Sequence, residues 1–224
     1  MEERASLPCL ADQAKRLVEM GVPELMGQNP GEVVHAASAL EATVGKKSAG
    51  SLLVPTRTAC PYADLMRLVT HQGHPGFVVE DFTDAFDFIP VSGPESKPVE
   101  LPDSPWYLLE DPRRGDEFEN ASPAEALEVI SDRGRITLTM TEGIFWLLQN
   151  PSVLERNHCF MTIGSRKPKA KGAFDSRTPA LWISNGTGRD GKEHRDAPKL
   201  GWCWWNNRHT WLGIAHAQGR IAAT

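Results

Sequence analysis

The first fifty residues carry apolar side chains at helical spacing. Residues 10–20 place leucine, alanine and valine on one face, and Gly21 ends the pattern as glycine commonly ends a helix. A second helix is expected over residues 30–44, where Asn29 can act as the N-cap. We therefore predict an N-terminal helical segment over residues 1–48 that packs on the rest of the chain.

The middle of the chain mixes strand-like and helix-like patterns. A short apolar run at 51–55 ends in proline, a helical pattern follows from Tyr62, and a second strand-like run covers 74–82. Two strands joined through one helix predict a βαβ unit, in which the strands pair in parallel. We assign residues 49–224 to one α+β domain, with a possible internal boundary in the proline-rich connector at 92–105.

Two further helices are indicated by their N-terminal caps. Ser122 is followed by Pro123, which suits the first helical position, and Thr139 is followed three residues later by Glu142, the spacing of a capping box. The second of these helices holds an apolar run at 144–148, which is too short to span a membrane.

The C-terminal part of the chain has the composition of β-strands. Strands are expected at 158–164, at 180–184 and on both sides of Asn206 and Asn207, because asparagine tolerates the positive φ angles of a two-residue type I′ turn. These strands predict an antiparallel meander of four strands. Together with the N-terminal helices and the mixed middle segment, the meander places the fold in the α+β class.

Strand alternation on either side of this turn divides the meander into two faces. Trp202 would lie opposite Trp211 and Trp204 opposite His209, and all four would share one face. Trp182 of the preceding strand joins that face if the aliphatic side chains form the core on the other. The aliphatic side chains expected on the core face are Leu181, Ile183, Leu212 and Ile214. The meander is therefore predicted to carry a tryptophan-rich face.

Three explanations fit a tryptophan-rich face. It can be a packed layer beneath the N-terminal helices or the helix at 141–150, since aromatic stripes usually belong to a core. It can line a pocket, in which tryptophan stacks on a planar, sugar-like or cationic ligand and His209 supplies a polar group. It can also be a protein interface, where tryptophan and arginine are enriched.

Charge is distributed unevenly along the chain. The 224 residues have a formal net charge of −5, yet residues 165–224 hold eleven lysines and arginines against four acids. The basic loop at 165–177 and the asparagine turn would lie at one end of the meander, so their cations would form a basic rim beside the tryptophans. This rim would contain Arg166, Lys167, Lys169, Lys171 and Arg208.

A basic rim beside aromatic side chains is typical of sites for phosphorylated ligands or single-stranded nucleic acid. No nucleic-acid-binding motif accompanies it, so nucleic acid is an unlikely partner, although the basic loop does not exclude one. The alternative is that the acidic first part and the basic last part of the chain attract each other within one molecule.

Several kinds of chemistry lack their sequence signatures. No glycine-rich phosphate loop follows a strand, and no cofactor is expected. His194, Cys203 and His209 do not have zinc-ligand spacing, and no metal is expected. The four cysteines form no CxxC pair, and the chain shows no signal peptide and no membrane-spanning run. A soluble cytoplasmic protein with free thiols and no membrane partner is therefore expected.

Several phrases of the sequence resemble a family of uncharacterised actinobacterial proteins, a domain of unknown function. The phrases are LLVPTRTACPYADLM, PGFVVEDFTDAFDFIP, RGDEFENASPAEALEVI, LTMTEGIFWLLQNP, PALWIS and APKLGWCWWNNRHTWLG. The resemblance runs from about residue 50 to the C-terminus, and the loops at 166–177 and 186–197 are longer and more charged than it leads us to expect. The resemblance implies a bacterial, cytosolic origin and no particular reaction.

These features favour a non-catalytic binding protein that holds a small molecule or a protein partner on the tryptophan-rich face. Its expected ligand-binding residues are Trp182, Trp202, Trp204, His209, Trp211, Arg166 and Arg208. The alternative is a small cytosolic enzyme that uses the same pocket, with His209 and a carboxylate from 80–87 or 111–117 as its acid–base pair. A carboxylate within about 3 Å of His209 would favour the enzyme.

Overall fold

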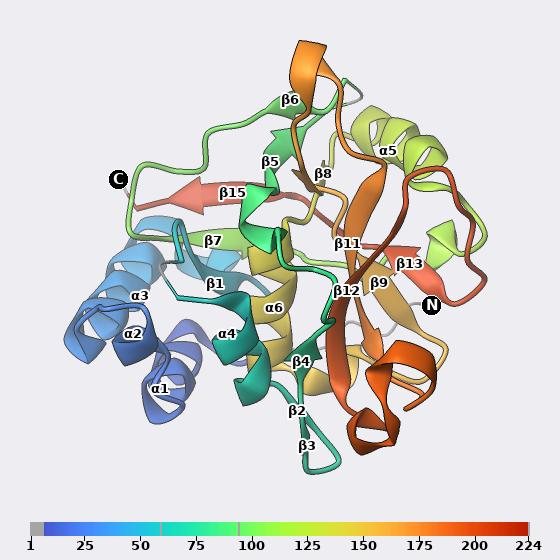
Figure 1. Ribbon diagram of the computed structural model, residues 1–224. Helices are drawn as coiled ribbons and strands as arrows, with labels where there is room; N and C mark the ends of the chain where they lie inside the picture. Colours follow the sequence, from blue (N-terminus) through green and yellow to red (C-terminus); the bar gives the residue numbers. More distant parts are fainter. Residues whose placement is uncertain (1–6, 59, 94, 224) are drawn as a thin grey trace.

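Three N-terminal helices pack against the remainder of the chain in the computed structural model, which describes residues 7–58, 60–93 and 95–223 (Figure 1). Within these ranges the α-helices are α1 (Leu10–Glu19), α2 (Val22–Leu25), α3 (Pro30–Val44), α4 (Tyr62–Leu68), α5 (Pro123–Asp132) and α6 (Met140–Gln149). None of them combines the length and apolarity needed to cross a bilayer. The predicted N-terminal helices are confirmed, because α1 buries Leu10, Ala14 and Leu17 in the core.

The predicted helix caps are also confirmed. Asn29, Ser122 and Thr139 each begin a helix with a complete capping box, in which the cap side chain and the glutamate three residues later satisfy each other's backbone N–H groups. Each cap depends on residues three apart in sequence, so the local pattern is sufficient to specify it.

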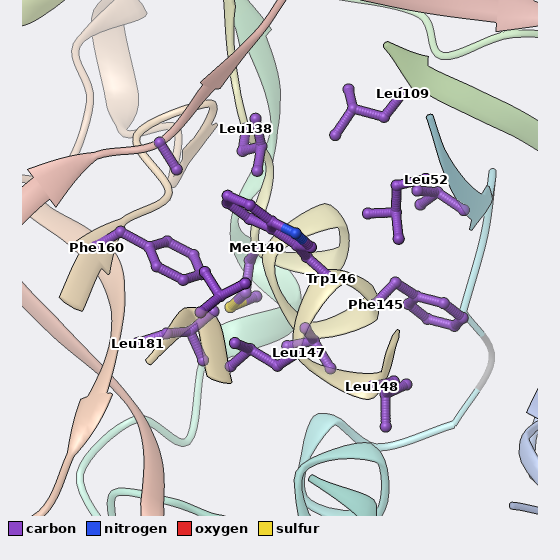
Figure 2. Close-up of a cluster of buried hydrophobic side chains, with 14 of the residues drawn as sticks. Leu52, Leu109, Leu138, Met140, Phe145, Trp146, Leu147, Leu148, Phe160 and Leu181 are labelled. Atoms are coloured by element: carbon purple, nitrogen blue, oxygen red, sulfur yellow. The ribbon is translucent and has the colours of Figure 1, made fainter. Parts of the chain in front are cut away.

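Helix α6 lies between two sheets and forms the centre of the core (Figure 1). Every one of its residues except Thr141 is buried. Figure 2 shows side chains of α6 with Leu52 and Leu109 on one side and Phe160 and Leu181 on the other. Because α6 is covered on both sides, its apolar positions do not keep to one face.

The smaller of these sheets is antiparallel and has the order β1 (Leu52–Pro55), β7 (Trp106–Glu110), β15 (Gly219–Ala222). The predicted βαβ unit is wrong. After α4 the chain passes through a short ribbon at 70–75 and then enters β4 (Phe77–Val78), which belongs to the other sheet and pairs with β12. The local pattern indicates strand, helix and strand, but the strand partners are chosen by contacts far apart in sequence.

The larger sheet has the order β13–β9–β11–β12–β4. Its C-terminal strands are β9 (Cys159–Met161), β11 (Arg177–Ile183), β12 (Pro198–Trp204) and β13 (Leu212–Ile214). Strands β9, β11 and β12 form the antiparallel meander expected from the sequence. Strand β13 pairs with β9 and β4 with β12, both in parallel, so the sheet is mixed.

The remaining strands form short ribbons. They are β2 (Thr70–His71) with β3 (His74–Pro75), β5 (Ile89–Ser92) with β6 (Lys97–Pro98) and β10 (Ser165–Arg166), and β8 (Ile136–Thr137) with β14 (His216–Ala217).

The hairpin predicted at Asn206 and Asn207 does not form. Neither asparagine is among the described residues with positive φ, so the backbone there is not a type I′ turn. The chain instead passes from β12 on one side of the meander to β13 on the other, and Trp202 is not paired with Trp211. The rings that do meet are Trp202 with Trp204, at a centroid distance of 4.8 Å, and Trp182 with Trp211, at 6.3 Å.

The expected division into an aromatic and an aliphatic face is therefore wrong as well. Directly paired residues share a face, and Trp182 is paired with Lys199 while Leu181 is paired with Leu200. Trp202, two residues after Leu200, belongs to the face that packs on α6, opposite Trp182. Both faces of the sheet are buried near β9 and β13, so alternation there does not separate core from solvent.

Candidate functional site

A hollow of about 580 Å³ lies over β4, β11 and β12, at the end of the sheet where the loop between β11 and β12 folds back. Side chains on the α6 side of β11 include Leu181, so the neighbouring Trp182 faces away from α6 and toward this hollow. The residues that border it are Phe77, Val78, Val79, Glu80, Asp81, Trp182, Asn185, Thr187, Asp190, Glu193, His194, Lys199 and Trp202.

The floor of the hollow follows from strand register. Lys199 is directly opposite Trp182 on β11 and opposite Phe77 on β4, so these three side chains lie on one face. Gly201 is the next residue of β12 on that face. A Cβ atom there would be only 2.5 Å from the Cη2 atom of Trp182, so glycine lets the indole extend across β12.

An ion pair joins the loop to this floor. The ammonium group of Lys199 is 2.6 Å from the Oδ1 atom of Asp190, and the two side chains are only 12% and 11% exposed. The same ammonium group lies 4.5 Å from the centre of the Trp182 ring, a cation–π distance. Ser184 Oγ donates to the second oxygen of Asp190 at 2.6 Å. Both carboxylate oxygens of Asp190 therefore take part in contacts that hold the loop closed on the sheet.

Two short 3₁₀ turns form the wall of the hollow, η6 (Gly188–Asp190) and η7 (Lys192–His194), drawn in dark orange in Figure 1. His194 Nδ1 donates to the backbone carbonyl of Asp190 at 2.6 Å. The His194 ring stacks on Phe77 with centroids 4.0 Å apart and planes inclined by 15°. The wall is thus fixed to both β4 and β12.

The hollow has acidic borders. Four of the bordering residues are carboxylates, and Lys199 is the single lysine or arginine among the described residues that border it. Because Asp190 compensates the charge of Lys199, Glu80 and Glu193 are left as exposed carboxylates at the border of the hollow.

Among the residues predicted to bind a ligand, Trp182 and Trp202 border the hollow. Trp204 is 45% exposed and lies beside Trp202, outside the bordering set. Trp211 touches the edge of Trp182 and also His209, whose ring centroid is 5.6 Å away. Trp211 and His209 therefore stand beside the hollow rather than in it.

His209 is not paired with a carboxylate through Nε2. That atom is buried and has no hydrogen-bond partner among the residues that the structure describes, and burial lowers the pKa of His209. The acid–base pair required by the enzyme alternative is therefore not formed at this atom.

Three cations of the predicted basic rim, Arg166, Lys167 and Arg208, are engaged in separate places. Arg166 is buried, with its guanidinium 3.6 Å from the centre of the Trp205 ring, and burial lowers the pKa of Arg166 to about 10. Lys167 forms ion pairs with Asp84 at 2.8 Å and Asp87 at 2.6 Å. Arg208 pairs with Glu125 at the start of α5. None of the three borders the hollow.

The carboxylates of the two predicted acidic segments, 80–87 and 111–117, are also engaged in separate places. Asp84 accepts hydrogen bonds from Arg177 at 3.0 and 2.5 Å, which lowers the pKa of Asp84 to about 2. Arg114 donates to both oxygens of Asp116, at 2.7 and 2.6 Å. Glu80 and Asp81 are the members of these segments that border the hollow.

Among the residues that the structure describes, one group of three side chains has the proximity needed to hold a metal ion. Single ligand atoms of Asp116, Glu119 and His158 lie within 4.8 Å of one another. Both Asp116 oxygens already accept from Arg114, and Glu119 Oε1 is 3.1 Å from His158 Nδ1. These contacts make the group a hydrogen-bonded network that supports the segment before α5.

Two of the four thiols, those of Cys159 and Cys203, are poorly suited to nucleophilic chemistry. Burial raises the pKa of Cys203 to about 12 and that of Cys159 to about 11. A thiol attacks as the thiolate, which is scarce at neutral pH when the pKa is this high.

Sequence reasoning missed most of the residues around the hollow, including Lys199, Asp190, His194 and Phe77. The signal that could have found them was the charged loop at 186–197, which supplies the wall. That loop meets Lys199 through pairing that no local pattern specifies.

Comparison with known proteins gives one family. A family model described as a family of unknown function (DUF5701) matches residues 16–223. No curated protein and no solved structure matches the chain.

Proposed function

The chain belongs to DUF5701, a family of unknown function, and we propose that it is a non-catalytic binding protein whose small-molecule ligand occupies the hollow above Trp182. The observation that carries the proposal is the closure of the 186–197 loop on the sheet through Asp190 and Lys199. This ion pair holds the loop against the sheet, so the wall of the hollow is part of the fold, as it is in most small-molecule sites.

The size and composition of the hollow support the proposal. A volume of about 580 Å³ falls within the range of small-molecule sites. Its aromatic floor and its ring of polar side chains from Asn185 to His194 combine stacking area with hydrogen-bonding groups. Such a combination fixes the orientation of a small ligand.

A blocking variant tests the proposal. Thr187 is exposed and borders the hollow, so Thr187→Trp should fill it without disturbing the core. Thr210→Trp is the matched control, because Thr210 is exposed and does not border the hollow.

The experiment is a thermal-shift screen of the wild-type protein against a metabolite library, with hits measured by calorimetry. We expect at least one compound to bind to the wild type and to Thr210→Trp but not to Thr187→Trp. The proposal fails if no compound binds, or if every hit binds equally to both variants.

We also place the protein in the cytoplasm of an actinobacterium. The four cysteines are free thiols, which fits a reducing compartment. The sequence phrases given above support the source. Cell fractionation of an expressing actinobacterium would test the compartment.

A further inference from the structure

We infer that the ligand of this hollow is an organic cation, an alkylammonium or guanidinium compound of small size. This inference rests on the proposed binding function. It comes from three features of the bordering residues: the sign of their charge, the partners of the carboxylates and the aromatic floor.

The first feature is charge. Carboxylates border the hollow on two sides, with Glu80 following β4 and Glu193 in the wall. An anionic ligand would meet these charges, and its sole basic contact among the described bordering residues would be Lys199, which Asp190 already neutralises. A cationic ligand is attracted by the same field.

The second feature is that two of these carboxylates are available. Glu80 and Glu193 are exposed and make no hydrogen bond or ion pair with any residue that the structure describes. Glu193 folds back over Gly191, where a Cβ atom would be 2.2 Å from Oε1, and the positive φ of 74° suits glycine there. A cation in the hollow could pair with either carboxylate without breaking a contact of the described chain.

The third feature is the aromatic floor. The ammonium group of Lys199 over Trp182 shows that this indole accepts a cation within the site. Phe77, stacked against His194, adds a second ring to the border. Aromatic rings together with carboxylates are the combination that binds alkylammonium groups in proteins.

Choline and 3,3-dimethylbutan-1-ol provide a direct test, because they have the same shape and differ in charge. We expect choline to bind at least about tenfold more tightly than the neutral alcohol in calorimetry at low salt. Affinity for choline should fall as sodium chloride is raised from about 0.05 to about 0.5 M.

Substitutions that remove single carboxylates test whether choline binds in the hollow. Glu80→Gln and Glu193→Gln should each weaken choline binding by about two- to fivefold, as expected for exposed charges. Glu128→Gln, an exposed glutamate of α5 outside the hollow, is the matched control and should bind choline as the wild type does.

The inference is overturned if the neutral alcohol binds as tightly as choline, if glucose or inorganic phosphate binds and choline does not, or if Glu128→Gln weakens choline binding as much as the other two. Binding of alcohol, glucose or phosphate that Thr187→Trp abolishes would leave the proposed function standing and remove only the cationic class. Absence of binding by all four probes rejects the cationic class, and the library screen then decides separately on the hollow itself.

Discussion

Arg220, in the last strand, donates two hydrogen bonds to Glu142, whose carboxylate is fully buried in α6. Nε meets Oε1 at 2.6 Å and Nη2 meets Oε2 at 2.9 Å. Tyr107 also donates to Oε1, at 2.7 Å, and the backbone N–H of Thr139 to Oε2, at 2.6 Å. One carboxylate therefore serves as a helix cap and as the anchor of the C-terminal strand.

Removing Arg220 should be strongly destabilising. Arg220→Met leaves a charged carboxylate buried without its cation, and we expect a loss of about 3–5 kcal/mol in the free energy of unfolding, measured with urea. Adding Glu142→Gln removes that charge, so the double variant should be more stable than Arg220→Met alone. A double variant that is less stable would contradict this account.

The same pair has a defined pH dependence. Burial alone would raise the pKa of Glu142, but Arg220 and the hydrogen bonds outweigh it, and the pKa lies below its usual value. The stabilisation is therefore complete above the pKa of an unfolded glutamate and is lost as pH falls through the lower folded value.

Breaking the ion pair of the 186–197 loop should loosen that loop selectively. Lys199→Met leaves Asp190 largely buried without a cation, and we expect a loss of about 1–3 kcal/mol in the free energy of unfolding. Hydrogen exchange of the backbone amides at 186–197 should quicken. Lys192→Met, an exposed lysine of the same loop, should leave both measurements unchanged.

Replacing Gly201 with alanine, which adds the smallest side chain, should destabilise the protein. Gly201→Ala brings a Cβ atom to 2.5 Å from the Trp182 ring, and we expect a cost of about 1–3 kcal/mol and a shifted tryptophan emission as the indole moves. Gly219→Ala is the control, since a Cβ atom there meets nothing closer than Glu110 Oε2 at 3.8 Å. Equal effects of the two substitutions would show that the indole is not held by this contact.

His216 should make the protein less stable in mild acid. Burial, together with the positive charges of Arg135 and Arg113, lowers the pKa of His216 to about 4, against the opposing effect of Glu117. Between pH 6.5 and about 4 the unfolded histidine binds a proton that the folded one does not, so stability falls with pH by up to about 3 kcal/mol. Urea unfolding at several pH values should show that the free energy of unfolding depends less on pH in His216→Gln than in the wild type. His35→Gln, at an exposed site on α3, should keep the pH dependence of the wild type.

The cysteines should differ sharply in reactivity. Cys9 is exposed, whereas Cys159 is buried and Cys203 half-buried, with thiol pKa values raised to about 11 and about 12. Iodoacetamide at about pH 8 should modify Cys9 within minutes and the other two only after unfolding. Mass spectrometry of the peptides distinguishes the sites, and rapid labelling of Cys203 in the folded protein would contradict this expectation.

The parts of the fold that could be predicted are those with short-range causes. The caps at Asn29, Ser122 and Thr139 depend on a glutamate three residues away, and the meander of β9, β11 and β12 is visible in strand composition. The partner of β1 and the position of β13 depend on contacts across much of the chain. The type I′ turn at Asn206 and Asn207 was predicted because asparagine tolerates positive φ angles. That tolerance allows such a turn but does not require one.

Of the residues that border the hollow, the sequence analysis had singled out Trp182 and Trp202 as ligand-binding residues and had not singled out the wall. Trp182 was assigned to a ligand-binding face, and the structure places it at the floor of the hollow. The wall comes from a loop whose charged residues have no periodic pattern. Asp190 meets Lys199 because register and loop closure bring them together, and neither is encoded by local spacing.

The order of the larger sheet also bears on self-association. Its longest strands, β11 and β12, have seven residues each and lie inside the sheet, while its two edges are β4, with two residues, and β13, with three. An exposed edge offers unpaired N–H and C=O groups to another chain, and very short edges offer few of them. Because the strand order places its shortest members outermost, the larger sheet gives a neighbouring molecule little backbone on which to add a strand.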